Sequence, residues 1–327
     1  MPIQPVPLLL QCARIVEESP FLSLDGGAVR DLAAWVRPDA LVLPGWAGAE
    51  MFEGPDATVI GWLLAYNAVN FCFWPDEGPR WYTLVHGEKV GRNDEALGVM
   101  AAFAQALRDG VPLTDGRFLA EMEPSTLEAL LAPAPGAGRL PLMGERVEGL
   151  RELGRAYLEH GGPMGLLGGG GTAALGVVER LASACPRWDD LRVWRGERVR
   201  FLKRAQLCVA MIHGRFAGKG VGAFRDLDRL TVFADYRLPQ ILRGTGILVL
   251  DADLASRIDR GEHLAPGSPE ETSLRAGAVH GAERLRQGFR ERGLDVNALV
   301  VDYYLWRSAV SEARRLAPHH RTRTTDY

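Results

Sequence analysis

A single aspartate within an apolar and aromatic segment is the first residue that suggests chemistry. Asp235 lies in residues 230–239, LTVFADYRLP, where the proline disfavours regular helix nearby. Burial raises the pKa of a carboxyl group, whereas a neighbouring cation such as Arg237 or Lys203 lowers it. The pattern therefore predicts a partly buried carboxylate that is either tuned for catalysis or held in a structural ion pair.

Lys203 and Asp302 are two further charged residues that accompany apolar helical faces. Lys203 lies off the apolar stripe of an expected helix over residues 199–216, where a solvated lysine is the ordinary outcome. Asp302 interrupts the apolar face of an expected helix over residues 298–316. Because a buried acid is costly unless it is paired, a structural partner is favoured for Asp302, and Arg, Lys, Tyr or a ligand would serve.

Three short segments have compositions that suit a nucleotide or its phosphate. Residues 70–74, NFCFW, combine an amide with three aromatic rings, which suits stacking on a flat base; a core hairpin is the alternative. Residues 319–323, HHRTR, can hold a phosphate, although a disordered terminus is the ordinary expectation. The glycine run 168–171 lacks the Lys-Ser/Thr of a P-loop, which favours a turn leading into a helix capped by Thr172.

Helices make up most of the expected structure that would position these residues. Apolar residues recur three or four positions apart between short turns rich in Gly and Pro. Examples of the expected helices are residues 28–36, 94–107, 147–158, 172–184, 199–216 and 298–316. Strand-like character is limited to residues 70–74 and 81–86, which a turn over residues 75–79 would join into a small hairpin in the N-terminal half. The predicted fold class is mainly α.

A stretch rich in Pro, Gly and Ala at residues 133–141 bears on the domain organisation. The chain has 327 residues, 47% of them hydrophobic, which is enough for a substantial core. The stretch either separates an N-terminal lobe, residues 1–135 with the hairpin, from a C-terminal lobe, residues 142–327 with Asp235, or it is a surface loop. In both cases residues 1–327 are expected to form a single catalytic domain.

Composition excludes several classes of function. The 38 Lys and Arg residues against 41 Asp and Glu give a formal charge of -3, which argues against long contacts with a nucleic-acid backbone but allows one or two phosphates. The four cysteines are scattered without metal-ligand spacing, so a reducing cytoplasm and no metal are expected. The proline-containing N-terminus lacks the layout of a secretory signal, and no apolar run reaches the roughly 18 residues of a membrane span.

Four segments resemble, in their order and spacing, the queuosine salvage proteins, which form the queuosine 5′-phosphate N-glycosylase family. They are residues 70–74 (NFCFW), 201–206 (FLKRAQ), 233–240 (FADYRLPQ) and 302–306 (DYYLW). The resemblance extends from about Asn70 to the His-Arg tail. It departs from the family pattern at residues 91–95, GRNDE, where a Gly-Tyr-Trp-Ser-like segment is usual. The first 60 or so residues, with Phe21 and Trp46, match only loosely.

The resemblance implies a helical fold related to the helix-hairpin-helix DNA glycosylases and an enzyme that releases queuine from queuosine 5′-monophosphate, leaving ribose 5-phosphate. Those glycosylases pair a lysine with an aspartate, for which Lys203 and Asp235 are the matching catalytic candidates. The expected substrate-binding residues are Asn70, Phe71, Trp74, Asp228, Tyr236, Arg237, Asp302, Tyr303, His319 and Arg321. The protein is expected to be a monomer without a cofactor. Its expected partners are the nucleotide and queuine, rather than polymeric nucleic acid or a membrane.

The implied mechanism assigns a task to each part of the site. Asp235 would stabilise the cationic sugar and orient or deprotonate a water molecule. Asn70 and a carboxylate would bind the guanine-like edge, while Phe71 or Trp74 would stack on the base. Lys203, Arg237, His319 or Arg321 would hold the 5′-phosphate. Two alternatives stay open at this point: a DNA or tRNA glycosylase, and a queuine-binding protein without catalytic activity.

Overall fold

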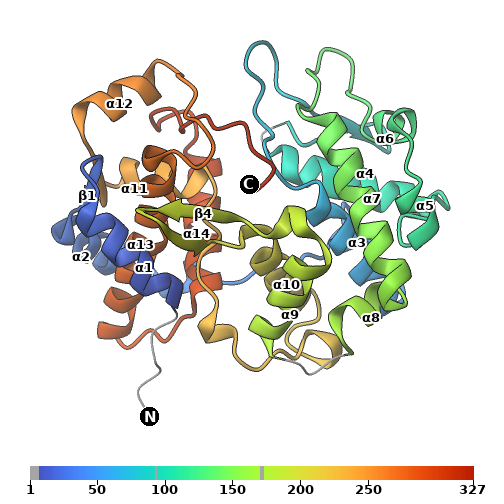
Figure 1. Cartoon of the computed structure of the whole chain (residues 1–327), viewed down its shortest axis with the longest axis horizontal. Helices are drawn as coiled ribbons and strands as arrows, with labels where there is room; N and C mark the ends of the chain where they lie inside the picture. The colour runs from blue at the N-terminus through green and yellow to red at the C-terminus, as the bar shows by residue number, and fades with distance from the viewer. Residues whose placement is uncertain (1–6, 93, 170–172) are drawn as a thin grey trace.

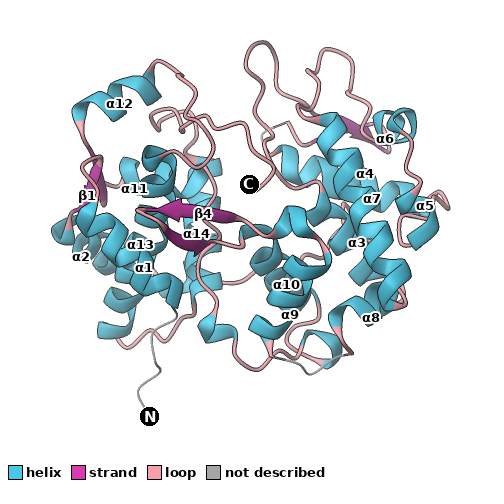
Figure 2. Ribbon diagram, in the orientation of Figure 1, coloured by secondary structure: helices cyan, strands magenta, loops and turns pink. Residues whose placement is uncertain are grey.

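The computed structural model describes residues 7–92, 94–169 and 173–327, which form a mainly helical fold with three small antiparallel sheets (Figures 1 and 2). This confirms the predicted fold class. The first helices are α1 (Pro7–Glu18), α2 (Gly26–Trp35), α3 (Asp56–Ala68) and α4 (Glu95–Arg108). Then follow α5 (Gly116–Ala120), α6 (Pro124–Leu130), α7 (Met143–His160), α8 (Pro163–Leu167) and α9 (Ala174–Ala184). The last are α10 (Lys203–Arg215), α11 (Arg237–Gly244), α12 (Ala252–Asp259), α13 (Pro269–Glu291) and α14 (Ala298–Ser311).

Each sheet of the described chain is a pair of short antiparallel strands. The pairs are β1 (Leu22–Leu24) with β6 (Leu248–Leu250), β2 (Thr83–Val85) with β3 (Glu88–Val90), and β4 (Leu191–Trp194) with β5 (Glu197–Arg200). The β4–β5 hairpin turns at Arg195 and Gly196, both with positive φ, which is the geometry of a two-residue hairpin turn. Within the described ranges, no helix is both long and apolar enough to cross a bilayer.

Two hydrophobic core clusters organise the molecule. The first core cluster lies among α3, α4, α7, α9 and α10, and the fully buried Trp62 and Phe103 belong to it. The second core cluster lies among α1, α2, α11, α13 and α14, and Phe289 and Leu305 belong to it. Figure 1 shows the blue helices α1 and α2 beside α13, which both contact. The clusters therefore do not follow a division at residues 133–141, because the N-terminal helices pack with the C-terminal half.

The predicted hairpin between residues 70–74 and 81–86 is wrong in its pairing. Residues 70–74 contain no strand, and the β2 strand pairs instead with β3 across His86 and Gly87. The physical reason is burial: Phe71, Cys72 and Trp74 form a small cluster with Tyr327. The Cys72 N–H donates to the carbonyl of Tyr327 at 2.8 Å, so the C-terminal segment takes the place that a strand partner would occupy.

The predicted helix over residues 199–216 begins four residues too early. Residues 199 and 200 belong to β5, and Leu202 has a left-handed backbone (φ 52°), so α10 begins at Lys203. The apolar stripe misleads because Phe201 and Ala205 are both buried, although Phe201 precedes the helix and only Ala205 belongs to it. The predicted Thr172 cap and residues 170–171 of the glycine run lie outside the described residues. The following helix, α9, begins at Ala174, whose N–H donates to Asp226.

Candidate active site

A cavity of about 360 Å³ lies at the junction of the two core clusters. Its lining includes Phe73 and Met100 of the first core cluster and Trp306, which packs against the second. The remaining wall comes from the loop 43–47, the end of α3, the start of α4, α10, residues 233–237, α14 and Tyr327. Segments distant in sequence thus meet around one partly open cavity, which suits a small molecule.

Asp235 lines this cavity two residues before α11 and is 9% exposed. Its Oδ1 accepts the N–H groups of Arg237 at 2.7 Å and Leu238 at 3.2 Å, so the first turn of α11 holds the carboxylate. Burial raises the pKa of Asp235 above its ordinary value, although Lys203 and the two backbone donors act to lower it. No donor from the described chain is bonded to Oδ2, which leaves that oxygen available to a ligand.

Lys203 also lines the cavity and is the first residue of α10. The side chain is only 5% exposed, which contradicts the solvated lysine that burial statistics favour. Burial lowers the pKa of Lys203 to about 8, while the negative charge of Asp235 acts to raise it. Within the described residues its Nζ forms no ion pair, so this ammonium group can contact a bound ligand as well as stabilise the Asp235 carboxylate.

Asp302, on α14, is another titratable group of this wall. Its Oδ1 accepts the N–H of Phe233 at 2.7 Å, two residues before Asp235. Burial raises the pKa of Asp302 well above its usual range, and the negative charge of Asp235 adds to this shift. The expected structural partner is therefore a backbone donor rather than a cation, and the carboxyl group also faces the cavity.

Four other predicted residues line the cavity: Asn70, Tyr236, Arg237 and Tyr303. The Asn70 side chain is buried, and no hydrogen bond joins it to the described chain, so its amide can bind a ligand. Arg237 donates to Gln240 at 3.0 Å. The Tyr303 ring stacks on Trp306 with 6.0 Å between centroids and lies 6.4 Å from Trp46. Trp46, from the weakly matching N-terminal part, thus reaches the cavity wall.

Five predicted residues do not line the cavity. Phe71 is fully buried beneath the guanidinium groups of Arg146 and Arg204, at 4.6 Å and 5.3 Å from its ring centroid. Trp74 lies 5.8 Å from His319 and 5.7 Å from the guanidinium of Arg321, in a cluster outside the cavity. Asp228 is exposed in a short turn (Leu227–Arg229). The residues concerned are Phe71, Trp74, Asp228, His319 and Arg321.

Four polar residues of the wall were not predicted from the sequence: Tyr66, Asp94, Glu95 and Tyr327. Asp94 accepts the Leu97 N–H at 3.4 Å as the cap of α4, and burial raises its pKa to about 6. An aspartate directly before a helix is the signal that could have identified this cap. Tyr327 donates its hydroxyl to Glu271 at 2.8 Å, a contact across the fold that no local pattern indicates.

The donor set of the cavity favours ionic and acid-base chemistry. Within residues 7–92, 94–169 and 173–327, no group of three or more His, Cys, Asp or Glu side chains has the arrangement of a metal site. The Lys203–Asp235 arrangement combines a cation with a carboxylate whose second oxygen has no described partner. Together with the cavity, these groups define a mainly helical protein with a binding site for a small molecule beside a lysine–aspartate pair.

The chain belongs to the queuosine salvage protein family, whose sequence profile matches residues 51–327. It is 35% identical over 322 residues to the queuosine 5′-phosphate N-glycosylase/hydrolase of Sphaerobacter thermophilus, covering 98% of this chain and 97% of that protein. Proteins with the same name from Schizosaccharomyces pombe and Mus musculus are each 29% identical to it; those matches cover 90% and 96% of both chains, respectively. The predicted family resemblance is confirmed.

Proposed function

We propose that this protein hydrolyses the N-glycosidic bond of queuosine 5′-phosphate and releases queuine and ribose 5-phosphate. The names of the relatives support this substrate and reaction. The observation that carries the proposal is the buried carboxylate of Asp235, which lines the cavity beside Lys203 with one oxygen bonded to backbone and the other available. A carboxylate in that position suits a reaction in which the sugar becomes cationic.

The chemistry proceeds by breaking the bond between the anomeric carbon and the base nitrogen. The bonding electron pair leaves with the base, and the negative charge of Asp235 stabilises the cationic sugar. A water oxygen then forms a bond to the anomeric carbon and gives one proton to Asp235. That proton finally neutralises the released base. Lys203 holds Asp235 ionised before the bond breaks, because a nearby cation favours the charged carboxylate.

Recognition of the nucleotide uses the rest of the cavity wall. Asn70 binds the edge of the guanine-like ring, and the rings of Tyr303 and Trp306 provide apolar contact. Arg237 contacts the 5′-phosphate, since of the predicted phosphate ligands it and Lys203 are the two that line the cavity. Asp94, with its pKa raised by burial to about 6, binds the amine of the base side chain.

Incubation of the purified protein with queuosine 5′-phosphate and with the queuosine nucleoside, followed by chromatography of the free base, tests the proposal. Release of queuine and ribose 5-phosphate from the nucleotide is expected, with slower release from the nucleoside, which lacks the phosphate contact. Tight binding of queuine without bond cleavage would instead identify a carrier protein. Binding that weakens steeply with salt would indicate a polymeric nucleic-acid substrate, since phosphate contacts release counterions.

We further propose that the fold is related to the helix-hairpin-helix DNA glycosylases. The support is the lysine–aspartate pair, in which Lys203 begins one helix and Asp235 precedes another. A superposition of this protein on those enzymes tests the relation. Coincidence of both residues with the catalytic pair of a DNA glycosylase is expected, and an unrelated order of helices around the pair would contradict it.

A further inference from the structure

We propose that Arg275 is a positioning residue for the reaction, because one buried guanidinium fixes the segments that carry Lys203 and Asp235. The inference rests on the proposed function above. Arg275 lies on α13, is 0% exposed and does not line the cavity. Its role is therefore to hold other residues rather than to touch the substrate.

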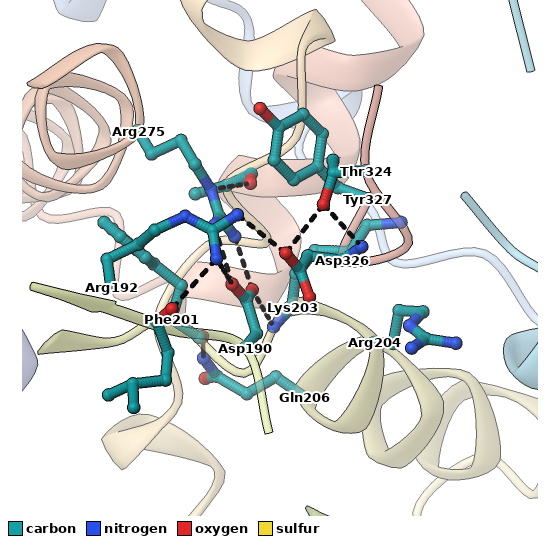
Figure 3. A network of polar contacts seen from close by, with 12 residues as sticks. Asp190, Arg192, Phe201, Lys203, Arg204, Gln206, Arg275, Thr324, Asp326 and Tyr327 are labelled. Atoms are coloured by element: carbon teal, nitrogen blue, oxygen red, sulfur yellow. Dashed lines mark hydrogen bonds and ion pairs between the residues drawn. The ribbon is translucent and has the colours of Figure 1, made fainter. Parts of the chain in front are cut away.

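The first half of this arrangement leads from Arg275 to Lys203 (Figure 3). Its Nη1 donates to Asp190 Oδ1 at 2.7 Å, and its Nη2 donates to Oδ2. Asp190 Oδ2 also accepts the main-chain N–H of Lys203 at 3.2 Å, and the Asp190 carbonyl accepts the Phe201 N–H at 2.9 Å. Because Leu202 offers no side-chain cap to α10, Asp190 replaces it and fixes the start of that helix.

The second half leads from the same guanidinium to Asp235. Arg275 Nε donates to the carbonyl oxygen of Ala234 at 2.9 Å, one residue before the proposed catalytic carboxylate. A guanidinium group is planar and rigid, so its Nε and Nη donors keep a constant spacing. The start of α10 and the loop before α11 are thereby connected through a single group.

Two aromatic rings pack close to this group. The guanidinium carbon of Arg275 lies 4.2 Å from the centroid of the Phe201 ring and 4.5 Å from that of Tyr327. Tyr327 is itself part of the cavity wall. Arg275 is thus linked to three cavity residues. Lys203 bonds to its partner Asp190, Asp235 follows its partner Ala234, and the ring of Tyr327 contacts Arg275 itself.

The placement matters because Lys203 and Asp235 influence each other without forming an ion pair. Their interaction depends on their separation, which the backbone must set. If the two segments move apart, Asp235 loses part of the stabilisation of its charged form, and its pKa rises. For the same reason the pKa of Lys203 falls. Other charged or titratable groups near the pair include Arg204, Arg237, Arg275, Asp190 and the carboxyl group of Asp302.

The test compares Arg275→Lys with Arg286→Met by measuring queuine release from queuosine 5′-phosphate between pH 5 and pH 10. Lysine keeps the positive charge but cannot reproduce the rigid fork. Arg286 is a matched control because it is also a buried arginine of α13, is paired with Glu283, and does not line the cavity. Melting temperature and queuine binding are measured for both variants.

For Arg275→Lys we expect kcat to fall by about 10²-fold, the loss that small misplacements of reacting groups cause, with a smaller change in KM. The pH range of activity should become narrower at both ends. The acidic limb shifts to higher pH because the pKa of Asp235 rises, and the basic limb shifts to lower pH because the pKa of Lys203 falls. Arg286→Met should keep the profile of the parent protein. A folded Arg275→Lys variant with the parent profile and kcat overturns the proposal, whereas an inactive parent protein contradicts the proposed function instead.

Asp190→Asn provides the second variant if Arg275→Lys does not fold. The amide oxygen can still accept the Lys203 N–H, while the two-bond ion pair with Arg275 is lost. A narrower pH profile and lower kcat in this variant support the positioning role. If neither variant folds while Arg286→Met does, the contacts are required for the fold itself, and the positioning role is overturned.

Discussion

The cavity wall and the adjacent ion-pair network both contain buried carboxyl groups, yet their pKa values shift in opposite directions. In the wall, burial raises the pKa of Asp235 and Asp302. In the network, burial also acts upward on Glu271 and Asp326, but the charges of Arg275 and Arg192 outweigh it and lower both pKa values. The regions are in contact through Tyr327, which bonds to Glu271 and lines the cavity.

The difference lies in the partners rather than in the depth of burial. Glu271 accepts hydrogen bonds from Arg192 Nε at 2.9 Å and from the Tyr327 hydroxyl, so both of its oxygens are bonded. Asp235 and Asp302 each accept hydrogen bonds from backbone N–H groups through Oδ1. Within the described residues, neither Oδ2 accepts a hydrogen bond. Asp235 and Asp302 thus keep an available oxygen at the site, whereas Glu271, with both oxygens bonded, supports the fold.

The replacement Asp235→Asn, in the cavity wall, is expected to have the largest effect on the rate of hydrolysis. The amide oxygen still accepts the Arg237 and Leu238 N–H groups, but the negative charge opposite the cationic sugar is gone. Hydrolysis should slow by about 10³-fold, comparable to the loss of other preorganised electrostatic groups. Queuine release measures the rate, while melting temperature and nucleotide affinity should remain close to those of the parent. Parent-like turnover would remove Asp235 from the mechanism.

A substitution in the ion-pair network is expected to lower the stability of the fold. Glu271→Gln removes a fully buried negative charge from between Arg192 and Arg275. Breaking a buried ion pair from one side costs about 3 kcal/mol or more in the free energy of unfolding. Chemical denaturation measures the loss, and kcat of the remaining folded protein should change little. A large fall in kcat without loss of stability would contradict the distinction between the two regions.

Local patterns predict several of the helices and a buried acid at position 235, but the long helices α3 and α13 were not among the expected ones. Asp235 stands out through its apolar neighbours, and the expected helix over residues 94–107 agrees closely with α4. The position of Lys203 could not be predicted, since its N–H is bonded to Asp190, which Arg275 holds, and these residues are 13 and 72 positions away along the chain. A local pattern does not encode such long-range contacts.

The aromatic residues at 70–74 also show that a local pattern does not predict long-range contacts. Their composition suits base stacking, but Phe71 packs beneath Arg146 and Arg204, whose positions come from α7 and α10. Tyr327 reaches the cavity wall through contacts of the C-terminal segment with residue 72 and α13. A composition therefore indicates what a side chain can bind, while tertiary packing decides whether it faces the ligand.

The pH dependence of activity tests the role of Lys203 in the cavity wall. Its pKa is lowered to about 8 by burial, so kcat/KM should decrease above this pH as the lysine becomes neutral and Asp235 loses a nearby cation. Lys203→Gln should abolish this basic limb and lower the plateau by at least about tenfold, which corresponds to about 1.4 kcal/mol of transition-state stabilisation. Measurement of kcat/KM from pH 6 to pH 10 checks both. An unchanged basic limb in the variant would assign it to another group.

The pH dependence of stability distinguishes Asp302 from Glu271. The folded-state pKa of Asp302 is raised, so above its unfolded value of about 4 the folded protein retains a proton that the unfolded chain loses, and stability falls as pH rises. Asp302→Asn keeps the acceptor for the Phe233 N–H and removes this cost. The variant should gain stability relative to the parent by up to about 1.4 kcal/mol per pH unit above pH 4.

Glu271 has the opposite sign and serves as the control for that measurement. Its folded-state pKa is lowered, so its contribution is fully present above the unfolded value of about 4.5 and is lost as pH falls through the folded-state pKa. The destabilisation of Glu271→Gln should therefore diminish in acid, while the advantage of Asp302→Asn grows toward neutral pH. Parallel curves for the two variants would contradict the opposite shifts.

The smallest effect is expected at Asp228, a predicted substrate ligand that the fold places in an exposed turn away from the cavity. Asp228→Asn should change the free energy of unfolding by less than about 0.5 kcal/mol, as surface substitutions usually do. KM for queuosine 5′-phosphate should stay within about twofold of the parent value, because less than 0.5 kcal/mol of binding would be involved. A clear rise in KM would mean that part of the nucleotide extends beyond the cavity, and recognition would then include the loop that precedes residues 230–239.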